Sequence, residues 1–552
     1  MSFRPTGEIL EDLPHRSRQG FLATLEMTHT SGLLSKVAPP AAIYCGQYLP
    51  VAADKPSTFM SITDIASWII VIMGWTAGLV MLALVLMFIQ DVTQTEHAVR
   101  RNFPVIGRLR YFLERQGEYF RQYFFAHDRQ ELPFNRATRT WVYRTAKNLG
   151  GIIGFGSTND LREPGSLIFV NAPYAVLEEE RQTTPPLVIG PRCNKPFTAS
   201  NIVNISGMSY GAISAPAVRA LSHGAAKAGV WLNTGEGGLA PYHIEGGCDV
   251  IFQLGTAKYG VRDLEGHLSD THLRDIAQHV RAFEIKLAQG AKPGRGGVLP
   301  AIKVTEEVAR IRGIPLGQPS DSPNRHYDIK NDDELLDMIV RIRDVTGLPV
   351  GIKTVLGSEA AILNLCETIL RRGVDSAPDF ISLDGGDGGS GAAPQVLADH
   401  VGLPLNESLP MLVDALIASG LRDRVRVIAS GKLVTSARVA WALCVGADFT
   451  VTARGFMFAL GCIQSLQCHQ NTCPTGITTH NRKLQRGLVM EDKTTRVANY
   501  AYWINLEVDK LAHSCGLANA REFRREHARI VQTAGRSVPL DALFPYPVKF
   551  GH

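Results

Sequence analysis

The segment FISLDGGDGGSGAAP, residues 380–394, is the clearest indication of the fold in this sequence. It begins as a short apolar run of the kind that forms a buried strand. Five glycines follow within residues 385–391. Glycine is required where backbone approaches a ligand closely or adopts a positive φ. A buried strand that runs directly into such a loop is typical of a parallel βα unit with a ligand site at its carboxyl end.

The same pattern repeats on both sides of this stretch. We predict eight parallel strands, at residues 202–206, 230–234, 250–254, 284–288, 349–355, 380–385, 425–431 and 448–455. Amphipathic stretches such as SAPAVRALSHGAAKAG and DDELLDMIVRIRDVTG separate them with apolar residues at helical spacing. The predicted fold class is therefore α/β, a (β/α)8 TIM barrel, with its active site where the strands end.

Composition excludes several classes of protein. Lys+Arg 57 against Asp+Glu 52 leaves a net charge of only +5, without a long run of one sign, so we expect no nucleic-acid partner. The nine cysteines do not resemble a secreted disulfide framework, because three lie within residues 462–473 and the other six are scattered. This crowding indicates metal ligation in a reducing compartment.

Residues 65–89, IASWIIVIMGWTAGLVMLALVLMFI, contain no charge and are long enough to cross a bilayer as one helix. Six arginines lie between residues 100 and 121, whereas only Lys55 precedes the helix closely. The positive-inside rule therefore predicts a single-pass protein of the cytoplasmic membrane with its catalytic domain in the cytoplasm. The alternatives are a buried helix of a soluble core and a cleaved signal peptide, whose apolar part would be shorter and would end in a small-residue cleavage site.

These patterns divide the chain into five parts. We expect a poorly ordered leader at 1–60, the transmembrane helix at 61–92 and a cytoplasmic connecting, helical region at 93–186. The barrel would occupy 187–535 and a C-terminal tail 536–552. Because the sequence from Met60 leads directly into the apolar helix, we expect Met60 to be the true first residue of the protein.

Three loops of the predicted barrel favour a phosphorylated cofactor such as FMN. Loops after the seventh and eighth strands of this fold commonly bind phosphate through backbone N–H groups. Lys353 ends the fifth strand, where its charge would stabilise a reduced flavin near N1 and C2=O. The predicted cofactor-binding residues in these segments are Lys353, Gly385, Gly386, Gly388, Gly389, Gly431, Lys432, Arg454 and Gly455.

The motif that most strongly indicates a metal site consists of Cys462, Cys468 and Cys473. Soft thiolate ligands favour an iron–sulfur cluster or zinc. A structural zinc ion needs a fourth ligand, and His469 lies awkwardly next to Cys468. Three cysteines without an evident fourth fit a [3Fe-4S] cluster. Zinc and buried structural cysteines are the alternatives.

Several segments together resemble the FMN-binding synthase domain of glutamate synthases over about residues 190–535. They are SGMSYGAIS (206–214), NTGEGG (233–238), KLAQGAKPGRGGVLPAIKV (286–304), SPNRHYDI (322–329), LDGGDGGSGAAP (383–394) and CHQNTCPTG (468–476). The resemblance implies a barrel with FMN and a [3Fe-4S] cluster that reductively aminates 2-oxoglutarate through 2-iminoglutarate. It places Ser209 at the cofactor and the three cysteines on the cluster.

The resemblance also implies that Glu236, Gln289, Lys292 and Arg312 line the pocket for 2-oxoglutarate and its imine. Lys292 and Arg312 would pair with the two carboxylates, and Glu236 would handle a proton or orient ammonia. Arg295 and Val298 depart from the family pattern, in which an acidic residue and a glutamine usually stand there.

The leading hypothesis is a membrane-anchored oxidoreductase of the class acting on CH-NH2 donors. It would form glutamate, or an N-substituted glutamate, from 2-oxoglutarate and ammonia or an amine. Because no N-terminal cysteine nucleophile and no GxGxxG after a strand are present, we expect a separate electron-donor protein and no glutamine hydrolysis. The alternatives are a membrane electron-transfer flavoprotein subunit and an FMN barrel acting on another 2-oxo or 2-hydroxy acid.

Overall fold

The computed structural model describes residues 61–548, in two compact units, Met1–Glu114 and Arg115–His552. The predictions of a leader at 1–60 and of a start at Met60 lie outside the described residues. The first unit contains the long helix α1 (Ile62–Thr93), α2 (Ala98–Asn102) and most of α3 (Gly107–Phe120). In α1 the only charged residues are Asp64 and Asp91, and its side chains are almost all exposed. It is the one helix in residues 61–548 that is long and apolar enough to cross a membrane.

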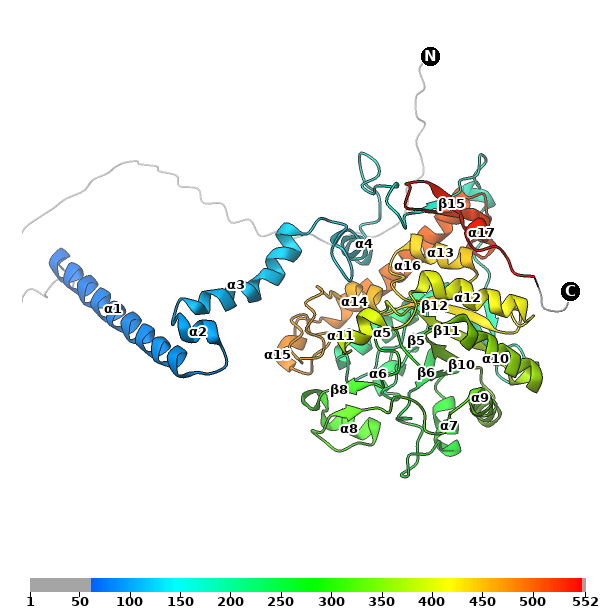
Figure 1. The fold of residues 1–552 in the computed structure, drawn as a ribbon, viewed down its shortest axis with the longest axis horizontal. Coiled ribbons are helices and arrows are strands. Elements are labelled where there is room, and N and C mark those ends of the chain that lie inside the picture. The colour runs from blue at the N-terminus through cyan, green and yellow to red at the C-terminus, as the bar shows by residue number, and fades with distance from the viewer. Residues whose placement is uncertain (1–60, 549–552) are drawn as a thin grey trace, which may run out of the picture. The chain divides into compact units, whose positions relative to one another are not determined.

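The second unit contains a closed parallel barrel of eight strands, which confirms the predicted fold (Figure 1). The strands are β4 (Val203–Ile205), β5 (Leu232–Asn233), β6 (Val250–Leu254), β7 (Ala282–Lys286), β10 (Val350–Thr354), β11 (Phe380–Asp384), β12 (Arg426–Ser430) and β13 (Phe449–Thr452). Each overlaps a strand predicted from the sequence. The barrel closes where β13 pairs with β4, at Val451 and Asn204.

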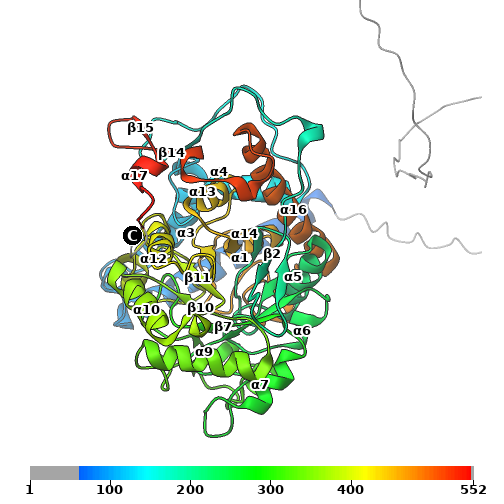
Figure 2. The same cartoon turned by 90° about the vertical axis from the view of Figure 1, so that its right-hand side faces the viewer.

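Helices surround these strands (Figure 2). They are α5 (Ala215–Ala228), α6 (Pro241–Ile244), α7 (Asp270–Ala277), α8 (Glu306–Arg312), α9 (Asp332–Thr346), α10 (Glu359–Arg372), α11 (Gln395–His400), α12 (Leu405–Ala418), α13 (Ser436–Val445), α14 (Arg454–Leu460), α15 (Arg482–Gln485) and α16 (Met490–Ser514). Local sequence sets their ends. The Asn331 side chain caps α9 by accepting a hydrogen bond from the Glu334 N–H, and Gly347, with φ +72°, ends that helix.

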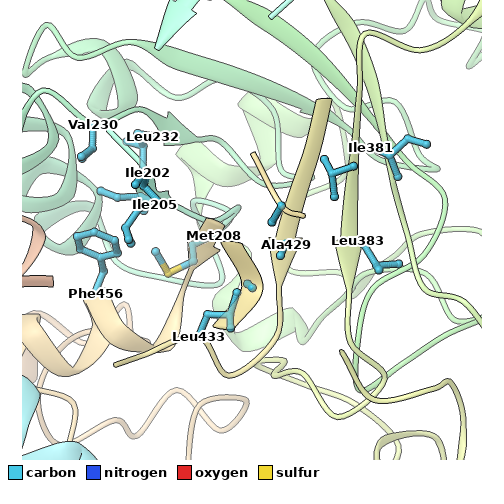
Figure 3. Packing of buried hydrophobic residues seen from close by; sticks show 14 of the residues in the cluster. Ile202, Ile205, Met208, Val230, Leu232, Ile381, Leu383, Ala429, Leu433 and Phe456 are labelled. Carbon is cyan, nitrogen blue, oxygen red and sulfur yellow. The ribbon is translucent and has the colours of Figure 1, made fainter. Parts of the chain in front are cut away.

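Two apolar cores hold the barrel together. Between strands and helices, Ile205 of β4 and Leu232 of β5 lie near Phe456 of α14 (Figure 3). Inside the barrel, Trp231, Phe380 and Phe449 pack with residues of a separate antiparallel hairpin. That hairpin, β2 (Leu187–Ile189) with β3 (Phe197–Ala199), fills the end of the barrel where the strands begin. The opposite end is therefore the one left for a ligand.

Smaller elements connect distant parts of the chain. Helix α4 (Arg136–Ala146) packs on α16. A three-stranded sheet joins β1 (Leu167–Phe169), β14 (Ala528–Val531) and β15 (Ser537–Pro539), and α17 (Leu540–Leu543) follows it. This sheet extends across the boundaries that the sequence predicted at 186 and 535. A second hairpin, β8 (Val298–Leu299) with β9 (Ser320–Asp321), lies outside the barrel ladder.

Candidate functional site

A large cavity opens at the carboxyl ends of the barrel strands and contains about 1330 Å³ of space. Most of its wall comes from the ends of the strands and from the segments that follow them, and Phe134, which precedes α4, also contributes. The wall includes Ser206, Gln253, Lys286, Lys353, Asp384, Ser430 and Thr452 from the ends of seven strands. Parallel strands bring their carboxyl ends to one face, so residues far apart in sequence meet here.

All four residues predicted to act on the substrate, Glu236, Gln289, Lys292 and Arg312, line this cavity. Glu236 is the centre of a charged cluster. Its Oε1 lies 2.8 Å from the Lys286 Nζ and 3.8 Å from the Lys292 Nζ. The Lys286 Nζ also donates to the Gln289 Oε1 at 2.8 Å. The structure therefore joins Gln289 to Glu236 through Lys286, which sequence reasoning missed.

Burial and the neighbouring charges set the protonation states of Glu236 and Lys292. Burial acts to raise the pKa of Glu236, but the two lysines outweigh it and lower the pKa to about 2. Burial lowers the pKa of Lys292 to about 8, while Glu236 opposes this change. Near neutral pH, Glu236 is thus an anion and Lys292 is a cation that can release its proton.

Positive charge dominates the cavity wall. Five buried cations line it, namely Lys286, Lys292, Lys303, Arg312 and Lys353, against the two carboxylates of Glu236 and Asp384. Burying an unpaired charge is costly, so such an excess is stable when anionic ligands complete the site. The cavity is therefore chemically suited to carboxylates and phosphate.

Arg312 ends α8 and reaches into this wall. Its terminal nitrogens donate to the Ser320 Oγ and the Tyr210 carbonyl oxygen, each at 3.1 Å. The guanidinium lies 5.3 Å from the centre of the Tyr259 ring. Its Nε is buried and has no hydrogen-bond partner among residues 61–548. The guanidinium is therefore held in the wall by its terminal nitrogens, while one of its donors has no protein partner among the described residues.

Lys353 and Asp384 lie on adjacent strands, β10 and β11. Their charged atoms are 3.5 Å apart. Burial acts to lower the pKa of Lys353, but nearby carboxylates, Asp384 first, raise it above its ordinary value. Asp384 in turn accepts hydrogen bonds from the Ser430 hydroxyl at 2.8 Å and the Gly290 N–H at 3.0 Å. Lys353 is thus held as a cation in the wall.

The predicted cofactor-binding residues fall into two groups. Six line the cavity, namely Ser209, Lys353, Gly389, Gly431, Lys432 and Arg454. The others, Gly385, Gly386, Gly388 and Gly455, do not line it, because protein atoms lie against them. A Cβ at Gly386 would lie 2.3 Å from the Gly402 carbonyl oxygen, and one at Gly455 would lie 2.1 Å from the Tyr500 hydroxyl. Gly386 thus allows two loops to approach closely, and Gly455 allows α14 to pack against α16.

The wall on the β12 and β13 side fits a phosphorylated flavin. Gly431 and Lys432 have φ of +132° and +52°, which turn the loop sharply after β12. Arg454 follows β13 and donates to the Ser390 carbonyl oxygen at 2.7 Å, which ties this loop to the glycine-rich loop after β11. The loops thereby supply both cations and backbone donors next to one large space.

All three predicted metal ligands, Cys462, Cys468 and Cys473, line a second, smaller cavity, and Cys468 also lines the large one. Within residues 61–548, no three His, Cys, Asp or Glu side chains lie close enough to hold a single metal ion. An iron–sulfur cluster does not require three ligands around one ion, because each thiolate binds a different iron atom. None of the eight described cysteines forms a disulfide, so the three thiols beside this cavity are free to act as ligands.

Contacts from three directions hold the cysteine segment. The Tyr143 hydroxyl of α4 donates to the Cys462 carbonyl oxygen at 2.6 Å. The Lys303 Nζ donates to the Cys468 carbonyl oxygen at 3.0 Å and to the Ala212 carbonyl oxygen at 2.7 Å. The Arg454 Nη1 lies 3.9 Å from the Cys468 Sγ. Lys303, also missed by sequence reasoning, thus connects the cysteine segment with the wall of the large cavity.

The two positions that depart from the family pattern lie at the same edge. Val298 of β8 lines the large cavity, while Arg295 lies 3.7 Å from Asp321 of β9. A Cβ at the neighbouring Gly297 would lie 2.6 Å from the Glu236 Oε1. The β8–β9 hairpin therefore places an apolar side chain next to the charged cluster.

Comparisons with known proteins agree with this geometry. Residues 157–518 match the family described as conserved region in glutamate synthase. The chain is 39% identical over 519 residues to the glutamate synthase large subunit-like protein YerD of Bacillus subtilis, covering 86% of this chain and 98% of that protein. It is 33% identical to an archaeal-type glutamate synthase (NADPH) of Thermotoga sp. strain RQ2, covering 60% of this chain and 62% of that protein.

A solved structure of the flavin-binding domain of baker's yeast flavocytochrome b2 is 13% identical, with a TM-score of 0.41, and the match covers 75% of this chain and 86% of that one. The family assignment depends on the sequence matches, which extend over most of the chain and include the cavity and the cysteine segment. The chain belongs to the glutamate synthase family, as a barrel related to the synthase part of the large subunit.

Proposed function

We propose that the chain is a flavin and iron–sulfur oxidoreductase of the glutamate synthase type. It reductively aminates 2-oxoglutarate, through 2-iminoglutarate, to glutamate or an N-substituted glutamate. Ammonia or an amine supplies the nitrogen, and a separate donor protein supplies the electrons. The observation that carries this proposal is the cavity with five buried cations, in which Lys292 and Arg312 stand beside the anionic Glu236.

Lys353, Gly431, Lys432 and Arg454 are proposed to hold FMN, since they combine positive charge with loop backbone at one wall. When bound there, FMN supplies the hydride that reduces the imine. Cys462, Cys468 and Cys473 are proposed to hold a [3Fe-4S] cluster beside the same cavity.

The chain's own residues divide the work on the substrate. Lys292 and Arg312 bind the two carboxylates of the 2-oxo acid and thereby orient its carbonyl group. Glu236 is an anion near neutral pH and therefore accepts a hydrogen bond from the incoming ammonia or amine. Lys292, with a pKa of about 8, is the group able to give a proton to the hydroxyl that leaves when the imine forms.

Turnover of defined substrates tests the proposal. The purified full chain, with FMN and iron measured, is incubated with 2-oxoglutarate, ammonium and a chemical reductant, and glutamate is quantified. Formation of glutamate supports reductive amination. A flavin-replete and cluster-replete protein that turns over no 2-oxo acid would support the electron-transfer alternative, and stoichiometric zinc without acid-labile sulfide would exclude the cluster.

We further propose that α1 anchors the protein in the cytoplasmic membrane as a single pass, with the barrel in the cytoplasm. Its 32 residues, largely uncharged and exposed, and the arginines that follow support this proposal. Reporter fusions at residue 130 test the orientation. Activity of a periplasmic reporter at that position would contradict it.

A further inference from the structure

The segment after α1 forms an amphipathic helix with an uncovered apolar face. In α3, residues Leu109, Phe112 and Leu113 lie on one side of the helix at spacings of three and four. Their exposed fractions are 56%, 58% and 53%. Glu114 and Glu118 lie on the opposite side. Large apolar side chains gathered on one face of a charged helix indicate a surface that binds an apolar partner.

Arginines border that apolar face. By helical geometry, Arg108 and Arg115 lie along one edge and Arg110 along the other. Among residues 61–548, no salt bridge to Arg110 or Arg115 is present. An apolar face flanked by free cations is complementary to a lipid surface with anionic headgroups, because the apolar side chains enter the acyl region while the arginines meet the headgroups.

A buried ion cluster connects α3 to the end of the apolar helix. The Asp91 side chain, at the end of α1, is fully buried and lies 2.8 Å from both the Arg100 and Arg108 guanidinium nitrogens. It also accepts a hydrogen bond from the Val105 N–H at 3.0 Å. Val105 itself has φ +66°, which turns the chain before α3 begins. The chain thus leaves α1 through a fixed turn, and α3 starts close to the point where α1 ends.

We infer that α3 is a second membrane contact, lying in the interface of an anionic bilayer with Leu109, Phe112 and Leu113 inserted. This inference rests on the proposed anchoring by α1. The occupant is a lipid surface because α3 begins only fourteen residues after α1 ends at Thr93 and carries the charge pattern that anionic headgroups complement. Together the two helices would hold the segment that leads to the barrel close to the membrane surface.

Photo-cross-linking in the full-length holoprotein tests this inference. The photoreactive amino acid p-benzoylphenylalanine replaces Phe112 on the apolar face, Glu114 on the charged face as a matched control, or Val80 in α1. Each protein is placed in nanodiscs of phosphatidylcholine alone or with phosphatidylglycerol, irradiated and analysed by mass spectrometry. We expect lipid adducts at positions 80 and 112, several-fold fewer at 114, and more at 112 when phosphatidylglycerol is present.

Comparing the three positions distinguishes failure of the inference about α3 from failure of the proposed anchoring by α1. Adducts at 80 without adducts at 112 would overturn the inference and leave the anchor intact. No lipid adduct at 80 would overturn the anchor and the inference with it. Adducts at 112 to a second copy or to another protein would identify a protein interface instead. Amide hydrogen exchange of the unsubstituted chain provides a second measurement, since residues 107–120 should exchange several-fold more slowly in anionic than in neutral nanodiscs.

Discussion

Replacing Glu236 by glutamine should change the pH range over which the protein binds 2-oxoglutarate. Burial lowers the pKa of Lys292 to about 8, and the Glu236 carboxylate acts in the opposite direction. Protonated Lys292 attracts the dianion, so binding weakens as pH rises through the pKa of Lys292. Without the Glu236 charge this pKa falls further, because burial and the nearby Lys286 then act unopposed. The weakening should therefore begin at lower pH in Glu236→Gln.

The distance between the charges sets the size of this effect. At 3.8 Å and an effective dielectric constant of about 20, the attraction is about 4 kcal/mol. That energy corresponds to roughly three pH units, since one unit equals about 1.4 kcal/mol. Lys286 lies closer to the same oxygen, at 2.8 Å, and its positive charge partly offsets the effect of Glu236 on Lys292. We call the loss of binding at high pH the alkaline limb of the binding curve. We expect its midpoint in Glu236→Gln to lie between about one and about three pH units lower than in the unsubstituted protein.

Isothermal titration calorimetry of 2-oxoglutarate, from about pH 4 to about pH 10, measures this limb in both proteins, because a fall of up to about three units from a pKa of about 8 would place it near pH 5 in the variant. Glu245→Gln is the matched control, because that carboxylate pairs with Arg219 away from the cavity. Lys292→Met should remove the limb altogether. A limb at the same or higher pH in Glu236→Gln would show that Lys292 is not the titrating group or that Glu236 does not act on it.

Three further substitutions test other parts of the site. Val298→Gln should raise activity with ammonia relative to methylamine, because an apolar part of the wall becomes polar; equal changes in kcat/KM for both would contradict this. Cys468→Ser should abolish the cluster while most FMN stays bound, which iron and flavin analysis would check. Gly455→Ala should destabilise the barrel by roughly 1–3 kcal/mol, because its Cβ would meet the buried Tyr500 hydroxyl; an unchanged denaturation midpoint would be inconsistent with that clash.

Strand positions could be predicted closely, but side-chain roles within a strand could not. The sequence placed a strand at 284–288, whereas β7 ends at Lys286. Beyond that point the Leu287 and Ala288 N–H groups both donate to the carbonyl oxygen of Lys353, so the regular ladder stops. Lys286 therefore ends its strand and reaches Glu236. A lysine at the carboxyl end of a mostly buried strand is the feature that could have identified it.

The domain boundary predicted at residue 535 shows a second limit of prediction from sequence. Residues 537–539, SVP, are too short and too rich in proline to predict a strand. They nevertheless pair with β14, which pairs with β1, more than 350 residues earlier in the chain. Pairing of that kind depends on where distant segments meet in space, and no local pattern records it.

The parallel βα repeat, the apolar helix and the glycine- and cysteine-rich segments could all be predicted before the structure, because each results from local periodicity or spacing. Which charged side chains meet could be seen only in the folded barrel. Lys286 joins Glu236 across fifty residues, and Lys303 reaches Cys468 across 165. These contacts form because the barrel closes and brings the carboxyl ends of all eight strands to one face, whatever their separation in sequence.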